Sequence, residues 1–357
     1  MKKPLYTVSA PGRICLFGEH SDYLGLPVIT MAMNLRLTIS AFPRKDKKFK
    51  IIMPDIHEEE IFTPSQALPY TKERDYLRSG VNVLKRKGCS FSKGYDFFVK
   101  SKIPINSGAS SSSALVVAWV KMLLALQHHE NEFNPIEIAK LAYEAEVLEF
   151  KEAGGRMDHF AISIGELIYH ENHKTIDIRF LDEAIQGIVL GDSLEKKETI
   201  ETLKKNSREV KEGFRQIKKV ISNFNVEITP VQEVLKKISE TSDPLQKAMA
   251  TLKNRDITHQ ALQELVLKPF QNPKKIGKLM NEHHLMLKKY LKISTPKIER
   301  MIKASLKAGA YGAKIHGSGL GGTMIAYAPG REKQVAKAIE RVGGKATLVH
   351  QDRGVIT

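Results

Sequence analysis

The sequence predicts an α+β fold in two domains. Segments typical of strands and of helices both occur, and residues 296–350 follow the order helix, strand, strand, helix, strand, which suits an α+β sandwich. The 357 residues are enough for two ordinary domains, and the apolar share of 42% is normal for packed cores. After residues 187–190 the sequence becomes rich in lysine and its pattern becomes typical of helices, so we expect domains at 1–185 and 186–357.

Apolar, β-branched runs bounded by turn residues predict strands in the N-terminal half. These runs are residues 6–9, 28–42, 49–53, 94–101, 160–169 and 176–180. Pro11 and Gly12 predict a turn-like break over residues 10–13, directly after the first strand. An amphipathic helix is expected over residues 70–87, between the third and fourth of these strands.

Further helices are expected on both sides of the domain boundary. Residues 114–127 are apolar all round, which predicts a buried helix. Pro135 opens the next helix, with apolar residues at helical spacing as far as Leu148, and Gly154-Gly155 break it. The second half is expected to be helical to about Tyr290. It then continues with helices at 296–308 and 330–342 and strands at 313–316, 323–328 and 346–350.

Composition and charge argue against several classes of protein. Cys15 and Cys89 are too few for a disulfide framework, so a reducing compartment is expected. No apolar run has the length of a membrane span and the N-terminus lacks a signal-peptide core, so we expect a cytoplasmic protein without a membrane partner. The net charge of +16 is compatible with nucleic-acid binding. The lysines are spread along helical segments, however, which favours solvated helix faces and no nucleic-acid partner.

A loop rich in glycine and serine precedes the buried helix. It runs Asn106-Ser107-Gly108-Ala109-Ser110-Ser111-Ser112-Ser113-Ala114. A helix N-terminus carries unpaired N–H groups and the positive end of the helix dipole, which together bind phosphate. The hydroxyls add donors for phosphate oxygens and ligands for Mg²⁺. The alternative is a serine-rich N-cap or a flexible linker.

A polar cluster stands between glycines after an apolar, strand-like run. It consists of Glu19, His20, Ser21 and Asp22. Polar side chains on a loop at a strand end are typical of ligand sites. Carboxylates and an imidazole are able to bind several sugar hydroxyls at once, and the preceding Arg13 is able to pair with an anion. The alternative is an ordinary polar turn.

Two carboxylates complete the candidate chemistry. Asp158 follows the Gly154-Gly155 turn and precedes an apolar strand-like run, and Glu146 lies on the helix before it. Near a phosphate loop, one carboxylate is suited to hold Mg²⁺ and the other to orient or deprotonate an attacking hydroxyl. The alternatives are a solvated helix residue for Glu146 and a turn or cap residue for Asp158.

A glycine-rich turn lies near the C-terminus. Gly317, Gly319 and Gly322 match the pattern G-x-G-x-x-G, but a strand-like run follows where a dinucleotide-binding fold requires a helix. We therefore expect a tight turn between two strands, close to a phosphate or to the serine loop. No G-x-x-x-x-G-K-[ST] motif occurs, so the chain is not a P-loop enzyme.

These four segments, in this order, resemble the galactokinase–homoserine kinase–mevalonate kinase–phosphomevalonate kinase (GHMP) superfamily over residues 11–329. All three motifs of that family are present. The resemblance implies an N-terminal domain like domain 2 of ribosomal protein S5, a C-terminal ferredoxin-like domain, and an active site between them. It also implies ATP and a sugar as partners and Mg²⁺ as cofactor, in a monomer or homodimer.

The resemblance also implies roles for individual residues. Asp158 corresponds to the catalytic aspartate, and Arg13 to the arginine that stabilises the transferring phosphoryl group. Ser112 and Glu146 are expected to bind Mg²⁺, with Ser111 as the alternative hydroxyl in the run of four serines. The residues expected to bind ATP are Ser107, Gly108, Ala109, Ser110, Ser111, Ser112, Ser113, Gly317, Gly319 and Gly321. The residues expected to bind the acceptor are Glu19, His20, Asp22 and Gly155.

The segment Glu19-His20-Ser21-Asp22-Tyr23 resembles the Glu-His-Thr-Asp-Tyr motif of galactokinases, whereas mevalonate kinases continue Glu-His with apolar residues. We therefore expect a galactokinase-like kinase that phosphorylates an anomeric hydroxyl; mevalonate kinase and a non-catalytic sugar sensor are the alternatives. Galactokinases usually have Ile-Met-Asp-Gln around the catalytic aspartate, but this chain has Arg-Met-Asp-His at residues 156–159. Arg156 either recognises an anionic sugar, such as a uronic acid, or points away and pairs with Glu149 or Glu152.

Overall fold

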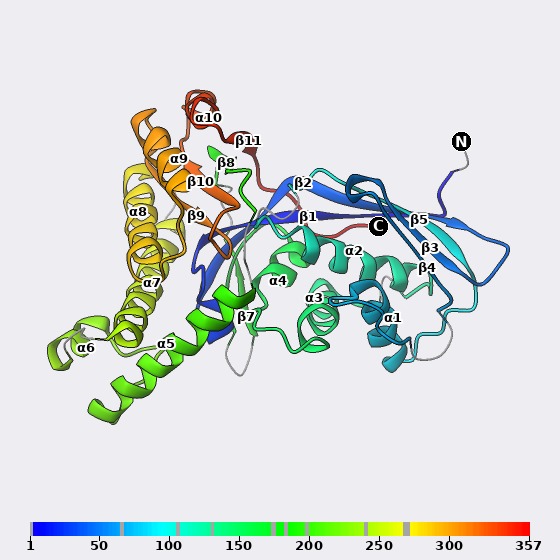
Figure 1. Cartoon of the computed structure of the whole chain (residues 1–357), viewed down its shortest axis with the longest axis horizontal. Coiled ribbons are helices and arrows are strands. Elements are labelled where there is room, and N and C mark those ends of the chain that lie inside the picture. The colour runs from blue at the N-terminus through cyan, green and yellow to red at the C-terminus, as the bar shows by residue number, and fades with distance from the viewer. Residues whose placement is uncertain are drawn as a thin grey trace.

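The computed structural model describes residues 3–64, 68–104, 108–129, 132–172, 176–181, 185–196, 200–238, 242–266 and 272–357. These residues form two lobes, each a β-sheet with helices packed against it (Figure 1). The predicted α+β class is therefore confirmed. The lobes share apolar packing, because the largest buried cluster joins N-terminal strands to Ile257 and Ile325 of the C-terminal lobe.

The N-terminal lobe is built on a seven-stranded mixed sheet. Its strands are β1 (Tyr6–Phe17), β2 (Val28–Pro43), β3 (Phe49–Met53), β4 (Glu58–Phe62), β5 (Tyr95–Ser101), β6 (Leu167–Asn172) and β7 (Ile176–Phe180). The order is β4-β3-β5-β2-β6-β7, and β1 pairs with the long strand β2. All pairs are antiparallel except β3 with β5. Strand β4 escaped the sequence prediction because its Glu-Glu-Glu-Ile-Phe sequence does not alternate in polarity.

The predicted break at residues 10–13 is wrong, because β1 continues through it. Antiparallel pairing with β2 runs from Tyr6 to Phe17, with a register shift between Pro11 and Gly12. Gly12 serves close packing: a β-carbon there would lie 2.4 Å from Met33 Cε. Turn-forming residues thus mark a bulge in a long strand, and the continuous strand carries Arg13 into the interior.

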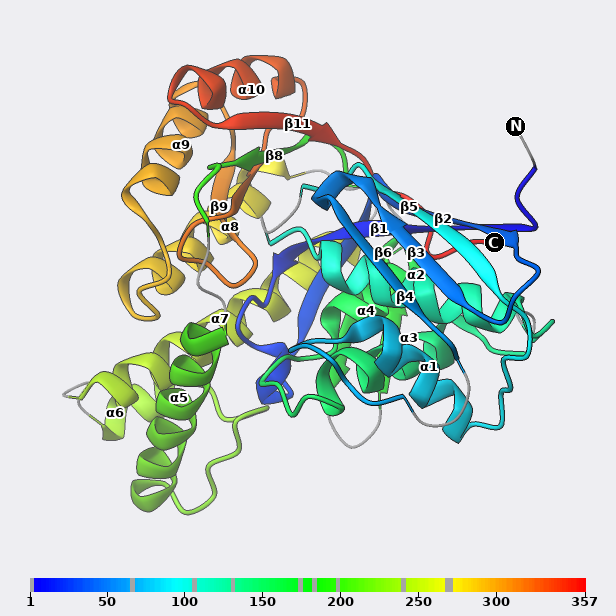
Figure 2. The same ribbon diagram turned by 45° about the vertical axis from the view of Figure 1, so that its right-hand side comes forward.

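Four α-helices cover one face of this sheet (Figures 1 and 2). They are α1 (Tyr76–Arg86), α2 (Ser111–Ala125), α3 (Pro135–Tyr143) and α4 (Met157–Ile164), with a π-helical segment, Glu144–Leu148, continuing α3. Helix α1 begins at Tyr76 rather than residue 70, because the Asp75 side chain caps it by accepting from the backbone N–H of Arg78. The strand predicted from residue 160 is wrong: its first part lies in α4, and the strand begins at Leu167. A short apolar run does not by itself distinguish a strand from a buried helix.

The C-terminal lobe contains a four-stranded antiparallel sheet. Its strands are β8 (Ile188–Asp192), β9 (Gly312–His316), β10 (Thr323–Tyr327) and β11 (Lys345–Val349), in the order β11-β8-β10-β9. Helices α9 (Pro296–Lys307) and α10 (Glu332–Arg341) complete the predicted ferredoxin-like arrangement. Among the residues that the structure describes between β8 and α9, four more helices occur: α5 (Ile200–Val220), α6 (Val231–Lys237), α7 (Asp243–Val266) and α8 (Pro273–Lys289).

The last residues of the chain return to the N-terminal sheet, as both views show (Figures 1 and 2). Ile356 pairs with Ser9 on β1, and Gln351 with Met33 on β2. Arg36 also donates to Asp352 and to nearby backbone carbonyls of this tail. The domain boundary near residue 185 stays a prediction. In the described part of the chain, no helix combines the length and apolarity that crossing a membrane requires.

Candidate active site

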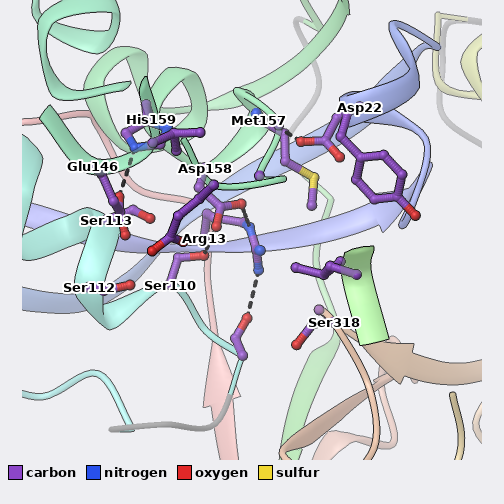
Figure 3. Close-up of a pocket in the computed structure, with 18 of the residues that line it drawn as sticks. Arg13, Asp22, Ser110, Ser112, Ser113, Glu146, Met157, Asp158, His159 and Ser318 are labelled. Carbon is purple, nitrogen blue, oxygen red and sulfur yellow. Dashed lines mark hydrogen bonds and ion pairs between the residues drawn. The ribbon is translucent and has the colours of Figure 1, made fainter. Parts of the chain in front are cut away.

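A cavity of about 230 Å³ lies where the two lobes meet (Figure 3). Its walls come from β1 and the loop after it, the N-terminus of α2, the π-helical segment, the first turn of α4, and the glycine turn between β9 and β10. The four chemistry-bearing segments of the sequence therefore converge on one cavity, although they are far apart along the chain.

Arg13 is a buried residue in the wall of this cavity, and its guanidinium bonds to two other parts of the wall. Its Nε donates to Asp158 Oδ1 over 2.7 Å, and its Nη1 donates to the carbonyl of Gly108 over 2.8 Å. The second oxygen of Asp158 accepts from the hydroxyl of Ser110 over 2.7 Å. Figure 3 shows these three side chains pointing toward one another from β1, from α4 and from the residue directly before α2. Asp158 lies in the first turn of α4, where a helix N-terminus favours a carboxylate.

The surroundings of Asp158 keep it ionised. Burial by itself would raise its pKa, but the Arg13 guanidinium and the Ser110 hydroxyl outweigh burial and hold the pKa below the usual aspartate value. A carboxylate that is ionised and fixed by two donors is suited to orient a hydroxyl group and accept its proton.

The N-terminus of α2 and the loop before it line one side of the cavity. Gly108 (φ 95°) and Ser110 (φ 58°) both adopt left-handed backbone conformations, which turn the chain sharply into the helix. Gly108 and Ser110 to Ser113 line the cavity, and Ala109 is buried behind them. Ser107 lies outside the described residues. The N–H groups of a first helical turn are of the kind that binds an anion, and phosphate binding at this turn stays a prediction.

Glu146 and Ser112 offer oxygen ligands of the kind that Mg²⁺ prefers. Both residues line the cavity, and Figure 3 shows Glu146 beside Ser113 and directed toward the serine loop. His159 Nε2 lies 2.7 Å from Glu146 Oε2 and orients this carboxylate. In the part of the chain that the structure describes, no three His, Cys, Asp or Glu side chains cluster as a metal site. The donor set therefore fits Mg²⁺ that is bound partly by phosphate oxygens.

Asp22 faces the cavity from the side opposite the serine loop. Its Oδ2 accepts from the backbone N–H of Met157 over 3.4 Å, and Gly155 packs against the carboxylate. Burial, and then the nearby charge of Asp158, raise the pKa of Asp22 to about 6. Asp22 is therefore a buried acceptor whose ionised form is stabilised by donors, such as the hydroxyl groups of a bound ligand.

His20 connects the same loop to the glycine turn of the C-terminal lobe. Its Nε2 donates to the carbonyl of Ser318 over 3.1 Å, and its Nδ1 lies 3.0 Å from the hydroxyl of Tyr23. The bond to a carbonyl fixes the proton on Nε2, so the Tyr23 hydroxyl donates to Nδ1. Burial lowers the pKa of His20 to about 4, so the imidazole is neutral at pH 7.

Glu19 does not line the cavity, although the sequence placed it with the acceptor ligands. The side chain is fully buried and forms an ion pair with Lys314 of β9. Its second oxygen lies 3.8 Å from His283 Nδ1, which is also buried. Glu19 thus helps to join the two lobes. The sequence alone did not distinguish this role from ligand binding, because Glu19 stands in a row of polar residues.

The three glycines of the turn between β9 and β10 that were expected to bind ATP occupy different positions. Gly317 lines the cavity and packs on Gly108: a β-carbon there would lie 2.9 Å from the Gly108 carbonyl oxygen. Gly319 packs against Ile293, and Gly321 against the backbone of Glu195, so neither lines the cavity. The turn brings the backbone of the C-terminal lobe onto the serine loop, as expected, and it does so through Gly317 and Ser318.

Arg156 does not line the cavity. Its guanidinium carbon lies 5.3 Å from the centre of the Tyr143 ring, as in a cation–π contact. The two glutamates proposed as its partners bond to other arginines, Glu149 to Arg86 and Glu152 to Arg74. The structure therefore agrees with the second alternative in keeping Arg156 out of the cavity, but not in the expected pairing with Glu149 or Glu152.

Several residues that line the cavity were given no part in the site by the sequence analysis. Arg74 and Glu152 line it and form a two-bond ion pair of 2.6 and 2.7 Å. No sequence pattern indicates that these two residues form an ion pair, because they lie on segments far apart in the chain. His159 and Tyr23 do have a signal, since each directly follows a residue singled out as functional.

Comparison with known families gives three matches along the chain. Residues 75–166 match the GHMP kinases N terminal domain, and residues 259–345 match the family described as GHMP kinases C terminal. Residues 1–43 match the galactokinase galactose-binding signature. These ranges include the serine loop, the catalytic candidate Asp158, the glycine turn and the polar cluster after β1.

Two kinds of relative are similar over nearly the whole chain. The chain is 30% identical to mevalonate kinase of Thermococcus gammatolerans, over 94% of this chain and 93% of that protein. It is 25% identical to galactokinase of Glaesserella parasuis, over 93% and 88%. Among solved structures, Lactococcus lactis galactokinase complexed with galactose superposes with a TM-score of 0.84 at 23% identity, covering 98% and 94%. Methanococcus jannaschii mevalonate kinase superposes with 0.75 at 21%, covering 98% of each chain. These structural likenesses show the fold.

Proposed function

The chain belongs to the GHMP kinase family, whose members transfer phosphoryl groups from ATP to alcohols, and we propose that it phosphorylates the anomeric hydroxyl of a neutral sugar. The observation that carries this proposal is the position of Asp22. A buried carboxylate faces the cavity beside Asp158 and is suited to accept hydrogen bonds from sugar hydroxyls. The galactose-binding signature over residues 1–43 supports the same acceptor class.

In the proposed reaction, Asp158 orients the attacking hydroxyl and accepts its proton, while Arg13 lies beside the oxygens of the transferring phosphoryl group. The N–H groups at the start of α2 hold the phosphates of ATP. Mg²⁺, bound by Glu146 and Ser112, would neutralise phosphate charge. Transfer of this kind depends mainly on positioning and charge stabilisation, which the fixed Arg13–Asp158–Ser110 group is suited to supply.

The charges around the cavity favour a neutral acceptor over an anionic one. The arginines among the described lining residues are Arg13 and Arg74, and each is bonded to a carboxylate. On the acceptor side, Asp22 and Asp158 would repel a carboxylate group of the substrate. Both mevalonate and uronic acids carry such a group. Arg156, whose charge would balance such a group, lies against Tyr143 instead.

Mevalonate kinase remains the second candidate for one specific reason. The mevalonate kinase relatives reach 30% identity, whereas the galactokinase relatives reach 25 and 26%. A test must therefore offer both acceptors to the same enzyme. A cytoplasmic location and a monomeric or dimeric state stay predictions beside either activity.

The deciding experiment measures ADP release from MgATP with a panel of acceptors. The panel contains galactose, other neutral hexoses and pentoses, galacturonate, glucuronate and mevalonate, and ³¹P NMR identifies the phosphorylated position. We expect turnover of one neutral sugar, with the phosphate on the anomeric oxygen and a large loss in Asp22→Asn. Asp243→Asn is the matched control, because Asp243 is an exposed aspartate outside the cavity, paired with Lys292.

The other outcomes each exclude something definite. Turnover of mevalonate alone would contradict the sugar assignment and leave the kinase chemistry intact. Turnover of uronic acids in preference to neutral hexoses would contradict the charge argument. Sugar binding by calorimetry without any ADP release would favour a non-catalytic sensor.

A further inference from the structure

His316 ends strand β9 in the C-terminal lobe, yet its side chain bonds to β1 of the N-terminal lobe. Its Nε2 lies 3.0 Å from Arg13 Nη1 and accepts from the backbone N–H of Cys15 over 3.1 Å. Its Nδ1 lies 2.9 Å from Thr323 Oγ1 on the neighbouring strand β10. The side chain is buried at 1% exposure, so these contacts are shielded from water.

The partners of His316 determine where its proton lies. A guanidinium and a backbone N–H are both donors, so Nε2 must carry a lone pair and accept from them. The ring proton therefore lies on Nδ1 and is donated to the hydroxyl oxygen of Thr323. The imidazole is thus a neutral acceptor aimed at Arg13, and Thr323 holds it in that form.

Arg13 is consequently held from three directions. Asp158 binds Nε from α4, while the Gly108 carbonyl and His316 Nε2 bind Nη1 from the serine loop and from β9. The contact with His316 is the one among these three that comes from the C-terminal lobe. A guanidinium that is fixed before the reaction stabilises developing charge without reorganising first.

We propose that His316 is a positioning residue that fixes the Arg13 guanidinium for phosphoryl transfer and makes its alignment depend on the placement of β9. This proposal rests on the function proposed above. His316 does not touch the reacting atoms; it acts through Arg13. Since His316 also binds the backbone of Cys15, the test must separate positioning from a general contribution to folding.

The test compares kcat, the two KM values and the melting temperature of three variants. His316→Leu removes the acceptor, and His316→Gln keeps an acceptor oxygen at the end of a side chain of similar length. His284→Leu is the matched control. His284 is also a buried histidine that accepts from a backbone N–H of β9, that of Ile315, but its side chain partner is Glu299.

We expect His316→Leu to lower kcat by roughly tenfold to a hundredfold, the size of effect that follows from losing one hydrogen bond to a charged group. The KM values for ATP and acceptor should change less than about threefold, since binding groups remain. His316→Gln should recover most of kcat, and His284→Leu should lower the melting temperature without a comparable loss of kcat. Equal loss in the leucine and glutamine variants, or no loss in either, would overturn the proposal.

A double-mutant cycle with Arg13→Lys makes the test specific. Lysine keeps the charge but lacks the planar fork that His316 aligns, so His316→Leu should change kcat much less in that background. Additive losses would mean that His316 acts independently of Arg13. If His316→Leu does not fold, Thr323→Val replaces it, because that change removes the oxygen that accepts from Nδ1.

A spectroscopic arm separates this proposal from the proposed function. In ¹⁵N-labelled enzyme, the Nη1 and Nη2 protons of Arg13 should give distinct, slowly exchanging signals in wild type and in His284→Leu, but not in His316→Leu. Absence of turnover with every acceptor would reject the proposed function alone. Unchanged guanidinium signals in His316→Leu would reject the positioning role, whether or not an acceptor has been found.

Discussion

The carboxylate of Asp22 occupies the space above the α-carbon of Gly155: a β-carbon at position 155 would lie 1.8 Å from Oδ2 and 2.2 Å from Cγ. Asp22 follows β1, and Gly155 lies just before α4. Glycine is needed here for close approach to the carboxylate. The contact fixes the position of Asp22 relative to Asp158, which lies in the first turn of that helix.

The first prediction follows from this contact. Gly155→Ala should displace the Asp22 carboxylate and raise the KM for the acceptor by about tenfold or more, while the KM for ATP stays near its wild-type value. Gly154→Ala is the matched control, because a β-carbon there meets Val147 Cγ2 at an ordinary 3.4 Å. Steady-state kinetics in both substrates measure the effect. Equal changes in the two variants would mean that Asp22 does not depend on this contact.

The second prediction concerns stability and pH. The folded-state pKa of Asp22 is about 6, above the ordinary value of 3.8. A raised carboxyl pKa favours the folded state at low pH, and this contribution is lost as pH rises through 6. At pH 8, where Asp22 is ionised, this shift lowers the free energy of unfolding by about 3 kcal/mol compared with an aspartate of ordinary pKa. Asp22→Asn removes the buried charge, so it should raise the melting temperature at pH 8 and have little effect below pH 4, although it weakens acceptor binding.

Melting curves of wild type and variant between pH 4 and pH 8 measure this difference. The exposed Asp243→Asn serves as control and should show no comparable pH dependence. Protonation of Asp22 should also affect kinetics. Below about pH 6 the KM of the wild-type enzyme for the acceptor should rise, because protonated Asp22 has lost one site that accepts a hydrogen bond. A melting temperature of Asp22→Asn that falls below wild type at pH 8 would contradict the burial argument.

The residues of the site were easier to predict than the strands and helices that carry them. Arg13, Ser110, Asp158, Glu146 and Asp22 were all named from the sequence, and the structure brings them around one cavity. Polar groups beside glycines, after apolar runs, are recognisable locally because no packed core requires them there. The part played by each of them in the reaction stays a prediction.

The remaining features depend on contacts between distant segments. Pro11 and Gly12 carry a local turn signal, but pairing with β2 extends β1 through them. Glu19 stands in the same polar row as Asp22, and only the approach of Lys314 from the other lobe places it in an ion pair. His316 shows no functional pattern in the sequence, because its role arises from a contact with Arg13 across the lobes.

The third prediction concerns the proton acceptor. Asp158→Asn should lower kcat by roughly 10²- to 10⁴-fold, because the amide is not able to take up the proton of the attacking hydroxyl. ATP affinity, measured by calorimetry, should remain within a few-fold of wild type. Asp177→Asn, which changes an exposed aspartate paired with Arg179, is the control. Turnover near the wild-type rate would remove Asp158 from the mechanism.

The fourth prediction concerns Mg²⁺. Glu146→Gln should raise the Mg²⁺ concentration for half-maximal ADP release by about tenfold or more, since a charged oxygen ligand is lost. Changing His159, which bonds to Glu146, should have a smaller effect in the same direction. The control is Glu144→Gln, on the same π-helical segment but paired with Arg86 outside the cavity. An unaltered Mg²⁺ dependence in Glu146→Gln would assign the metal to other ligands.

The fifth prediction concerns the buried ion pair between Glu19 and Lys314, both fully inaccessible to water. Lys314→Met leaves the carboxylate buried without its partner, so the free energy of unfolding should fall by about 3–5 kcal/mol. The double change Glu19→Leu with Lys314→Met removes both charges and should recover much of that loss. Lys292→Met, which breaks an exposed pair with Asp243, should cost no more than about 1 kcal/mol. Chemical denaturation measures all four proteins, and a double variant that is no more stable than Lys314→Met would contradict this account of the buried pair.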